Sequence, residues 1–260
     1  MSEEKDVFET ISDQLVGLAG KASDLVERGR TAEWSDFWDA FQNNGQPTNY
    51  SGAFGADGWT VETFKPKYDI VPTNAYMIFR TNKNLNIDLV EHLNQLGVKL
   101  DLSQSVNTQY LFTASAFTRI GVVDVSGSTN SSPLDSAFQG CNKLVTIDKI
   151  IPKKGTGTNG EFASNTFHTC SALENLTIEG EITSNGLNLQ WSTKLSKKSI
   201  ESVISCLDLT EGRPATSITL SKIAVDNAFE GASDDNGFGN DEWNNLCASA
   251  RVANWTISLI

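Results

Sequence analysis

The sequence contains no run of about eighteen consecutive apolar residues, the length that a helix needs to cross a bilayer. Its first residues, Met1 to Asp6, are acidic, whereas a secretory signal begins with basic residues and continues with apolar ones. Basic residues are also few, because 20 Lys and Arg stand against 32 Asp and Glu and leave a net charge of -12. Such a charge repels nucleic acid. We therefore expect no membrane insertion, no secretory signal and no nucleic-acid partner.

Cysteine is scarce for a chain of 260 residues. The four cysteines are Cys141, Cys170, Cys206 and Cys247. They are too few for a disulfide framework, and no CxxC pair among them has the spacing of a zinc site. We predict reduced and mostly buried thiols.

The two histidines are the other residues to test for chemistry. His92 falls beside the apolar side of a short predicted helix that carries Leu89, Leu93 and Leu96, so we predict a half-exposed helical residue. His168 lies two residues before Cys170, but side chains two apart on a turn or extended segment rarely meet as a nucleophile pair. No nucleophile elbow, phosphate-binding loop, zinc helix or dinucleotide fingerprint occurs.

The acidic loop Ser233–Glu242 raises the question of calcium. It lacks the alternating acidic residues and the closing glutamate of an EF-hand, so a solvated turn is the favoured interpretation. The sequence thus predicts no metal, no cofactor and no catalytic residue.

Residues 1–31 carry a heptad pattern. The apolar residues Phe8, Ile11, Leu15, Leu18, Ala22 and Leu25 follow one another at alternating separations of 3 and 4. This seam predicts an amphipathic, coiled-coil-like helix. Gly17 and Gly20 each weaken an isolated helix by about 1 kcal/mol, so the helix needs a partner. Phe8, Ile11, Leu15, Leu18 and Leu25 form the candidate interaction surface, toward another copy, another protein or the chain's own globular part.

Residues 32–69 are dense in aromatic side chains. Trp34, Phe37, Trp38 and Phe41 recur at helical spacing, and a turn-rich stretch follows. Aromatic side chains on a surface stack on sugars or peptides, but at helical spacing they are more typical of a core. We predict that residues 32–69 cap the next part of the chain.

Residues 70–260 contain an internal repeat. Phe138-Gln-Gly-Cys141-Asn-Lys-Leu144 aligns with Phe167-His-Thr-Cys170-Ser-Ala-Leu173, 29 residues later. Weaker copies occur at Phe79 with Asn82 and Leu85, at Phe112 with Ser115 and Ile120, and at Leu189 with Ser192 and Leu195. Repeats of about 20–30 residues stack because no single turn covers its own apolar side. The inward positions are Phe79, Phe112, Phe138, Cys141, Leu144, Phe167, Cys170 and Leu173.

The last third of the chain departs from this frame. Ile200, Val203, Ile204 and Leu207 predict a helix, and Trp243, Leu246, Cys247 and Ala250 predict another that begins near Asp241. A strand is predicted over residues 255–259. Because solenoid ends need units that close the core against water, we assign a C-terminal cap from about residue 199.

The frame A-F-x-x-C-x-x-L at residues 137–144, and its partner at residues 166–173, resembles the BspA-like leucine-rich repeats. The stretches Trp34–Gly45, Tyr50–Phe54 and Phe64–Asp69 resemble the leader of repeat proteins encoded by tailed phages and prophages of gut bacteria. The first resemblance implies an α+β fold: a short, irregular leucine-rich-repeat solenoid with an aromatic, helical N-terminal cap, a helix-containing C-terminal cap and a separate N-terminal heptad helix. The second implies a virion protein assembled in a bacterial cytoplasm.

The expected function is therefore that of a non-enzymatic structural or interaction protein. Its partners would be other virion subunits or further copies through the N-terminal helix, and a host surface protein or glycan through the solenoid. One alternative is a bacterial cell-surface adhesin of the BspA-like type. Another is a polysaccharide hydrolase with Asp234 and Glu242 as its paired carboxylates.

Overall fold

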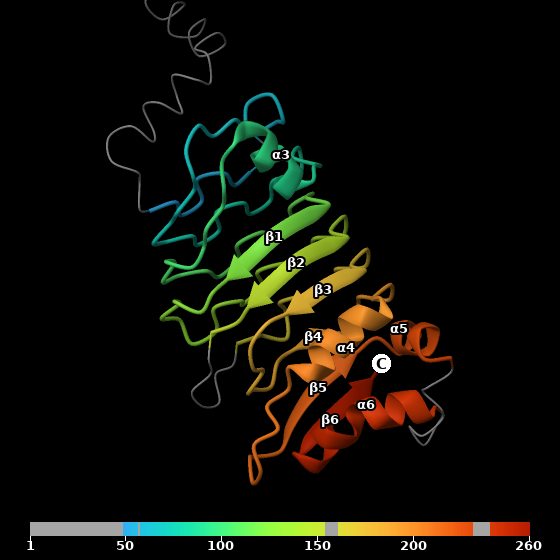
Figure 1. The fold of residues 1–260 in the computed structure, drawn as a ribbon. Helices are drawn as coiled ribbons and strands as arrows, with labels where there is room; N and C mark the ends of the chain where they lie inside the picture. The colour runs from blue at the N-terminus through green and yellow to red at the C-terminus, as the bar shows by residue number, and fades with distance from the viewer. Residues whose placement is uncertain (1–48, 57, 154–160, 231–239) are drawn as a thin grey trace, which may run out of the picture. The chain divides into compact units, whose positions relative to one another are not determined.

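The computed structural model describes residues 49–56, 58–153, 161–230 and 240–260. The chain divides into two compact units, Met1–Gly45 and Gln46–Ile260, and every described residue belongs to the second. That unit contains helices and two small parallel sheets, which confirms the predicted α+β class (Figure 1). The predicted helix over residues 1–31, with its seam Phe8, Ile11, Leu15, Leu18 and Leu25, lies outside the described residues.

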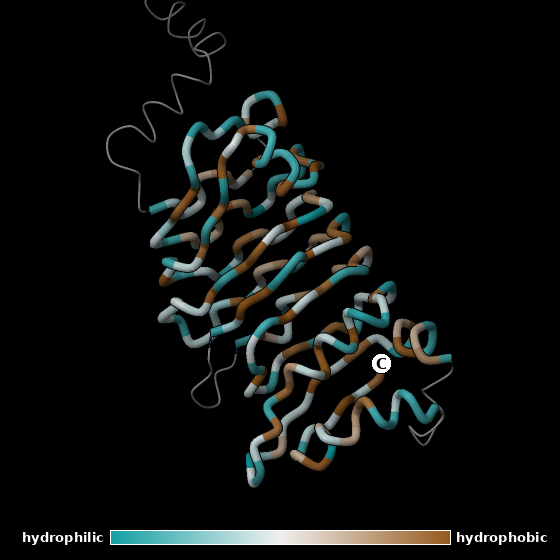
Figure 2. The backbone as a smooth tube through the Cα atoms, in the orientation of Figure 1, coloured by the Kyte–Doolittle hydropathy of each residue, from teal (hydrophilic) through white to brown (hydrophobic). Residues whose placement is uncertain are grey.

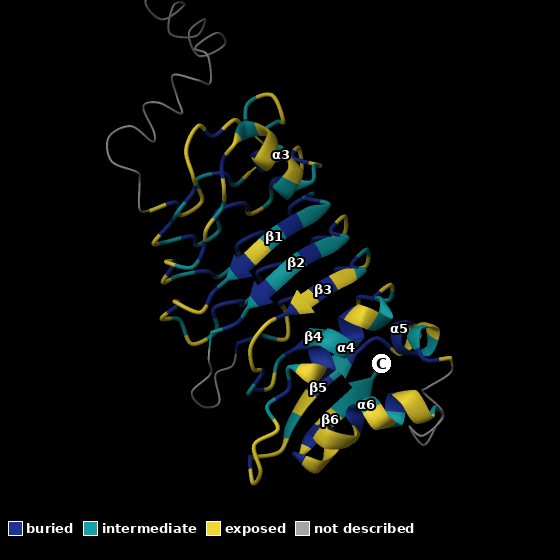
Figure 3. Ribbon diagram, in the orientation of Figure 1, coloured by how far each residue is buried: buried dark blue, intermediate teal, exposed yellow. Residues whose placement is uncertain are grey.

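The first sheet consists of three parallel strands in sequence order: β1 (Arg119–Asp124), β2 (Thr146–Ile151) and β3 (Asn175–Ile178). Ile120, Ile147 and Leu176 lie opposite one another across the three strands and are at most 2% exposed. Hydrophilic stretches interrupt the hydrophobic ones along these strands (Figure 2). In β1 an exposed stretch lies between the buried residues Ile120 and Val123 (Figure 3). The sheet therefore has one buried and one solvated side.

The second sheet pairs β4 (Asn188–Leu189), β5 (Thr216–Leu220) and β6 (Trp255–Leu259), again in parallel. Helix α3 (Leu89–Leu96) packs on β1, and α4 (Lys197–Ser205) contacts β3. Helices α5 (Lys222–Ala228) and α6 (Asp241–Val252) lie between β5 and β6 in the chain. The predicted helices at Ile200 and Asp241 and the predicted strand over residues 255–259 are confirmed.

Polar caps determine where these helices begin. The Asp88 side chain accepts a hydrogen bond from the Glu91 N–H, and the Asn240 side chain accepts from two N–H groups in the first turn of α6. Ser196 and Ser221 cap α4 and α5 in the same way. Each cap satisfies an N–H group that a helix start leaves unpaired and stabilises the helix by about 1 kcal/mol.

Five phenylalanine rings form one row in the core: Phe54, Phe79, Phe112, Phe138 and Phe167. Neighbouring ring centroids lie 5.3–5.7 Å apart, and from Phe79 onward the planes are within 10° of parallel. All five side chains are completely buried. Phe54, which the sequence analysis placed in the N-terminal cap, is thus the first ring of the same row.

Backbone hydrogen bonds run beside this row of rings. The Phe79 N–H donates to the carbonyl of Leu111, the residue before Phe112, at 2.8 Å. The same bond links Phe54 to Ile78, Phe112 to Ala137 and Phe138 to Thr166. Around the first four rings the residues two before and two after have left-handed backbone, as at Tyr110 (φ 57°) and Ala114 (φ 55°) around Phe112, and at Phe167 only the residue two after does. A residue other than glycine adopts this conformation at a cost of about 1–2 kcal/mol, so the rings and their bonds must hold the turns in place.

The residue three positions after a ring has a repeated task. Asn82 Nδ2 donates to the carbonyl of Phe54 at 2.9 Å, and the Sγ atoms of Cys141 and Cys170 donate to the carbonyls of Phe112 and Phe138 at 3.0 Å. Each bond satisfies a carbonyl in the core that would otherwise be costly to bury. The cysteines of the sequence frame are therefore small buried donors.

The outer edge of β3 is closed by serine side chains of α4. Ser199 Oγ accepts from the Leu176 N–H and donates to the Glu174 carbonyl, both at 2.9 Å. Ser202 Oγ accepts from the Ile178 N–H at 2.9 Å. A further strand would offer donors and acceptors of the same kind, so the two serines take its place at the Leu176 and Ile178 N–H groups and at the Glu174 carbonyl.

Replacing Ser199 by alanine is expected to lower the free energy of unfolding by about 1–3 kcal/mol, because the Leu176 N–H loses its partner and the Glu174 carbonyl keeps only the bond from the Ser196 N–H. Ser205→Ala, at an exposed serine on the same helix, should change it by less than about 0.5 kcal/mol. Urea unfolding measures both values. Equal values for the two variants would contradict the role assigned to Ser199.

Candidate binding groove beside the first sheet

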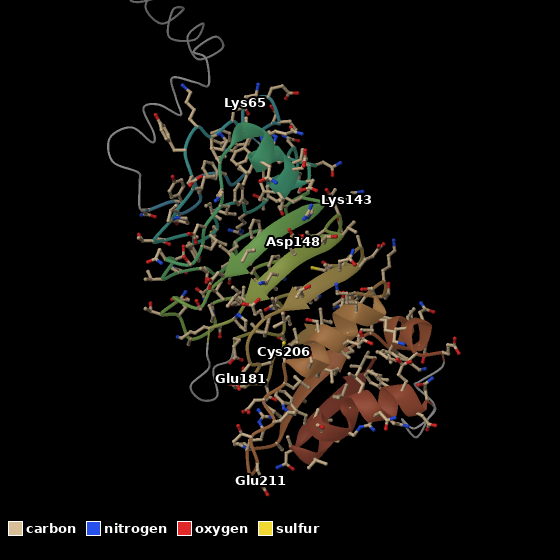
Figure 4. All side chains as sticks on the ribbon, viewed as in Figure 1. Lys65, Lys143, Asp148, Glu181, Cys206 and Glu211 are labelled. Carbon is tan, nitrogen blue, oxygen red and sulfur yellow. The ribbon has the colours of Figure 1, made fainter. Side chains whose placement is uncertain are left out.

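Charged side chains occupy the solvated side of the first sheet. Arg119 on β1 and Asp148 on β2 form a two-pronged pair, Nε to Oδ1 at 2.7 Å and Nη2 to Oδ2 at 2.8 Å. Asp88 Oδ2 lies 3.6 Å from Arg119 Nη1. The hydrogen bond to Asp148 raises the pKa of Arg119. Lys149 on β2 and Glu179, just after β3, form a second ion pair. Figure 4 labels Asp148 on the first sheet. Fixed pairs of this kind orient side chains and contribute little stability.

An apolar groove of about 210 Å³ opens between α3 and β1. Its lining includes Leu93 and Val98, which are at most 5% exposed, and Val122, which is 48% exposed. Gly121 also lines it: a Cβ atom at this position would lie 3.1 Å from Val90 Cγ2. The absence of a side chain at residue 121 therefore keeps the groove open.

Polar side chains form the rim of the groove. Asn94 and Lys99 stand on the α3 side, and Asp148 stands on the β2 side. The Lys99 N–H donates to Asp69 Oδ1 at 2.8 Å, which fixes the segment that carries this lysine. Within the described residues no carboxylate forms an ion pair with the Lys99 ammonium, whereas Asp148 is already paired with Arg119. An apolar floor inside a polar rim is the usual anatomy of a protein-binding site.

The size of the groove limits what it can hold. Small-molecule sites measure about 300–1,000 Å³, whereas an apolar cavity of about 150 Å³ accepts benzene. A groove of about 210 Å³ therefore has room for one large apolar side chain. Such anchoring side chains carry much of the binding energy of protein interfaces.

The structure brings the predicted repeat residues together. Phe79, Phe112, Phe138, Cys141, Leu144, Phe167, Cys170 and Leu173 are all completely buried. Ile120 lies opposite Ile147 in the sheet. Leu144 stands three residues before Ile147, and the residue three before Ile120 is Phe117, whose buried ring takes the place of the leucine. These residues build the core and do not line the groove.

His92 lies on α3 and is half-buried, as predicted. Its Nε2 lies 2.6 Å from the Phe64 carbonyl, and its ring stacks on the Phe64 ring at 5.8 Å. This histidine therefore ties α3 to the aromatic segment. Leu96, predicted on the buried side with Leu89 and Leu93, is only half-buried because it stands in the last turn of the helix.

His168 and Cys170 have different neighbours. The His168 ring contacts the edge of the Trp191 ring at 5.3 Å, whereas Cys170 Sγ donates to the Phe138 carbonyl. Burial raises the pKa of the Cys170 thiol well above its ordinary value. The thiol is thus held neutral, which disfavours a nucleophilic role.

Thiol reactivity should follow burial. Cys141, Cys170 and Cys247 are buried and Cys206 is half-buried, and all four are free. Burial raises the pKa of Cys141 to about 11 and that of Cys247 to about 12. In the folded protein we expect Cys206 to react slowly with a chromogenic disulfide and the three buried thiols not to react. In denaturant all four thiols should react. Rapid reaction of several thiols in the folded protein would contradict this arrangement.

The remaining site hypotheses find little support in the described residues. Glu242 forms an ion pair with Lys197, Nζ to Oε1 at 2.6 Å, and its proposed partner Asp234 lies outside the described residues, as does most of the acidic loop. No cluster of three or more metal-ligating side chains occurs in the described part of the chain. Among the described helices, none combines the length and the apolar character of a membrane span.

The groove was not predicted from the sequence, and neither was β1, which forms one of its walls. A glycine inside a strand is a signal for close approach of a neighbour, and Gly121 between Ile120 and Val122 is such a residue.

Comparison of the chain with protein-family models, with curated proteins and with solved structures finds no match.

Proposed function

We propose that residues 49–260 form a leucine-rich-repeat solenoid of the BspA-like kind. Three observations support this proposal: the single row of phenylalanine rings, the backbone bond from each ring residue to the residue before the next ring, and the donor three positions later. All three recur at the positions of the frame F-x-x-C-x-x-L. The helices α4, α5 and α6 then belong to the C-terminal cap.

On this scaffold the protein acts as a non-enzymatic interaction protein. The groove between α3 and β1 carries this assignment, because it is apolar, too small for most metabolites and bordered by a lysine without an ion pair among the described residues. It suits one bulky apolar side chain with an acidic neighbour, presented by a protein partner. A rigid sheet on one wall reduces the ordering cost of binding.

A displayed library of random peptides tests this function. Peptides selected on the full chain should carry a bulky apolar residue next to Asp or Glu, and Gly121→Val should weaken their binding at least tenfold because the new side chain fills the groove. Thr177→Val, on the exposed side of β3, is the matched control and should bind normally. Peptides that bind the wild-type chain and Gly121→Val equally would refute the site.

The biological setting that we propose is a phage virion, in which the N-terminal helix docks on other subunits or on further copies. The support is the resemblance of residues 34–69 to the leader of phage repeat proteins and the heptad seam of residues 1–31. Mass spectrometry of purified particles from an induced host should detect the chain in stoichiometric amounts. Its recovery in cell envelopes instead would favour the adhesin alternative.

A further inference from the structure

Strand β6 leaves one edge of the second sheet open. It is the outermost strand in the order β4-β5-β6, and no described residue pairs with it on the other side. The Ile260 N–H donates to the Leu220 carbonyl, and the Asn254 carbonyl accepts from the Thr216 N–H. Because backbone groups alternate in direction along a strand, residues 254, 256, 258 and 260 face β5, and Trp255, Ile257 and Leu259 direct theirs away from it.

The open edge differs from the edge of the first sheet. The outward N–H groups of β3 are bonded to Ser199 and Ser202 of α4, whereas within the described residues no hydrogen bond reaches the outward groups of Ile257 or Leu259. A solvated row of this kind is a template for another strand.

Charged residues, proline and a bulge are devices that prevent edge pairing, and all three are missing from β6. Residues 252–260 contain no charged residue and no proline. The pairing of β6 with β5 runs from Trp255 to Leu259 without a shift in register, so no bulge twists the edge away. The side chains of Ile257 and Leu259 are only half-buried although they share a face with the buried Trp255. Apolar surface thus remains along the edge.

We propose that β6 pairs with β6 of a second copy of this chain, antiparallel and around a two-fold axis at Ile257. In this register all three outward residues bond to the partner strand. Thr256 of each copy lies opposite Ser258 of the other, and cross-strand hydroxyl pairs of this type are stabilising. An uncharged strand allows two chains of net charge -12 to approach without like charges opposite each other. The pairing is isologous and closes at two copies.

This surface is independent of the groove and of the N-terminal helix, so its test uses the full chain. Sedimentation equilibrium should show a dimerisation step that Thr256→Lys weakens at least tenfold, because a lysine at the edge opposes pairing. Thr177→Lys, the same change on β3, is the control and should leave the step unchanged. Ile257→Pro removes an outward N–H and no hydrogen bond to β5, and it should also weaken the step.

A dimerisation step of equal strength in the wild type and in all three variants would overturn the proposal. A wild-type chain that stays monomeric up to roughly 1 mM would overturn it as well. Association through the N-terminal helix is distinguishable, because it would persist unchanged in Thr256→Lys.

Mixed disulfide formation tests the register. Residues 256 and 258 of opposite copies form non-hydrogen-bonded pairs, whose Cα atoms lie about 4.5 Å apart, within the range that a disulfide spans. A mixture of the Thr256→Cys and Ser258→Cys chains should therefore cross-link on oxidation, whereas each variant alone should not. The axis at Ile257 would be overturned if Ser258→Cys cross-linked by itself and the mixture cross-linked no more than that variant does.

Discussion

Phe112→Ala is expected to lower the free energy of unfolding by about 3–5 kcal/mol, a large part of the stability of a typical domain. The Phe112 ring is completely buried and lies between Phe79 at 5.5 Å and Phe138 at 5.7 Å. Removing it loses these two ring contacts and a third with the Phe117 ring at 6.0 Å, and it leaves a cavity that the left-handed turns on either side cannot collapse to fill.

Urea unfolding followed by tryptophan fluorescence measures this loss. Trp191→Ala removes an aromatic ring that is 43% exposed and contacts the His168 ring at its edge, so it should cost about 1 kcal/mol or less. The two variants therefore separate the ring row from aromatic residues in general. A loss below about 1 kcal/mol for Phe112→Ala would show that the row does not carry the core.

Asp208→Ala should destabilise the protein by a similar amount, about 3–5 kcal/mol, because it removes the only ion-pair partner of a buried arginine within the described residues. The Arg213 side chain is 5% exposed, and its Nε lies 3.4 Å from Asp208 Oδ2. Its guanidinium carbon lies 4.0 Å from the centroid of the Trp255 ring, and Nη2 donates to the Thr183 carbonyl at 2.7 Å. Nε and Nη1 lack hydrogen-bond partners, so little else compensates the charge.

The double variant Asp208→Ala with Arg213→Met should recover most of this loss, since no unpaired charge is then buried. Asp226→Ala, which breaks an exposed pair with Lys222 on α5, is the control and should cost about 0.5 kcal/mol. Thermal unfolding of the four proteins gives the comparison. A double variant as unstable as Asp208→Ala would mean that the carboxylate acts through its backbone turn alone.

The Asp208 contribution should also depend on pH. The hydrogen bond from the Thr210 hydroxyl, aided by the charge of Arg213, lowers the pKa of Asp208 from its ordinary value of 3.8. Between the two pKa values the unfolded chain binds more protons than the folded one, so stability rises with pH. The difference between wild type and Asp208→Ala should be full above about pH 4 and should shrink as the pH falls through the lowered pKa of Asp208.

The helices and strands whose apolar residues recur at regular spacing were predicted from the sequence. Ile200, Val203 and Ile204 are buried on α4, and Trp243 and Cys247 are buried on α6, as their spacing indicates. β5 and α5 were not predicted, because Thr216–Leu220 alternates only weakly and Lys222–Ala228 spans two turns. Short elements of this kind depend on their neighbours more than on their own pattern.

The candidate site was harder to predict than the core. Leu93 lies on α3 and Val98 just after its C-terminal end, whereas Val122 lies on β1, and only the packing of α3 on β1 makes them one surface. Phe54 was assigned to a cap because its nearest sequence neighbours are aromatic, whereas its place in the ring row depends on a residue 25 positions later, Phe79. Such long-range contacts leave no local periodicity to read.

The left-handed residues around each ring have a consequence for stiffness. Tyr110 and Ala114 can relax only if the Phe112 ring leaves its neighbours, so turn and ring must move together. A bend at one turn would therefore cost both stacking and backbone hydrogen bonds at once. The row of rings and the turns beside it are thus expected to deform as one unit and not turn by turn.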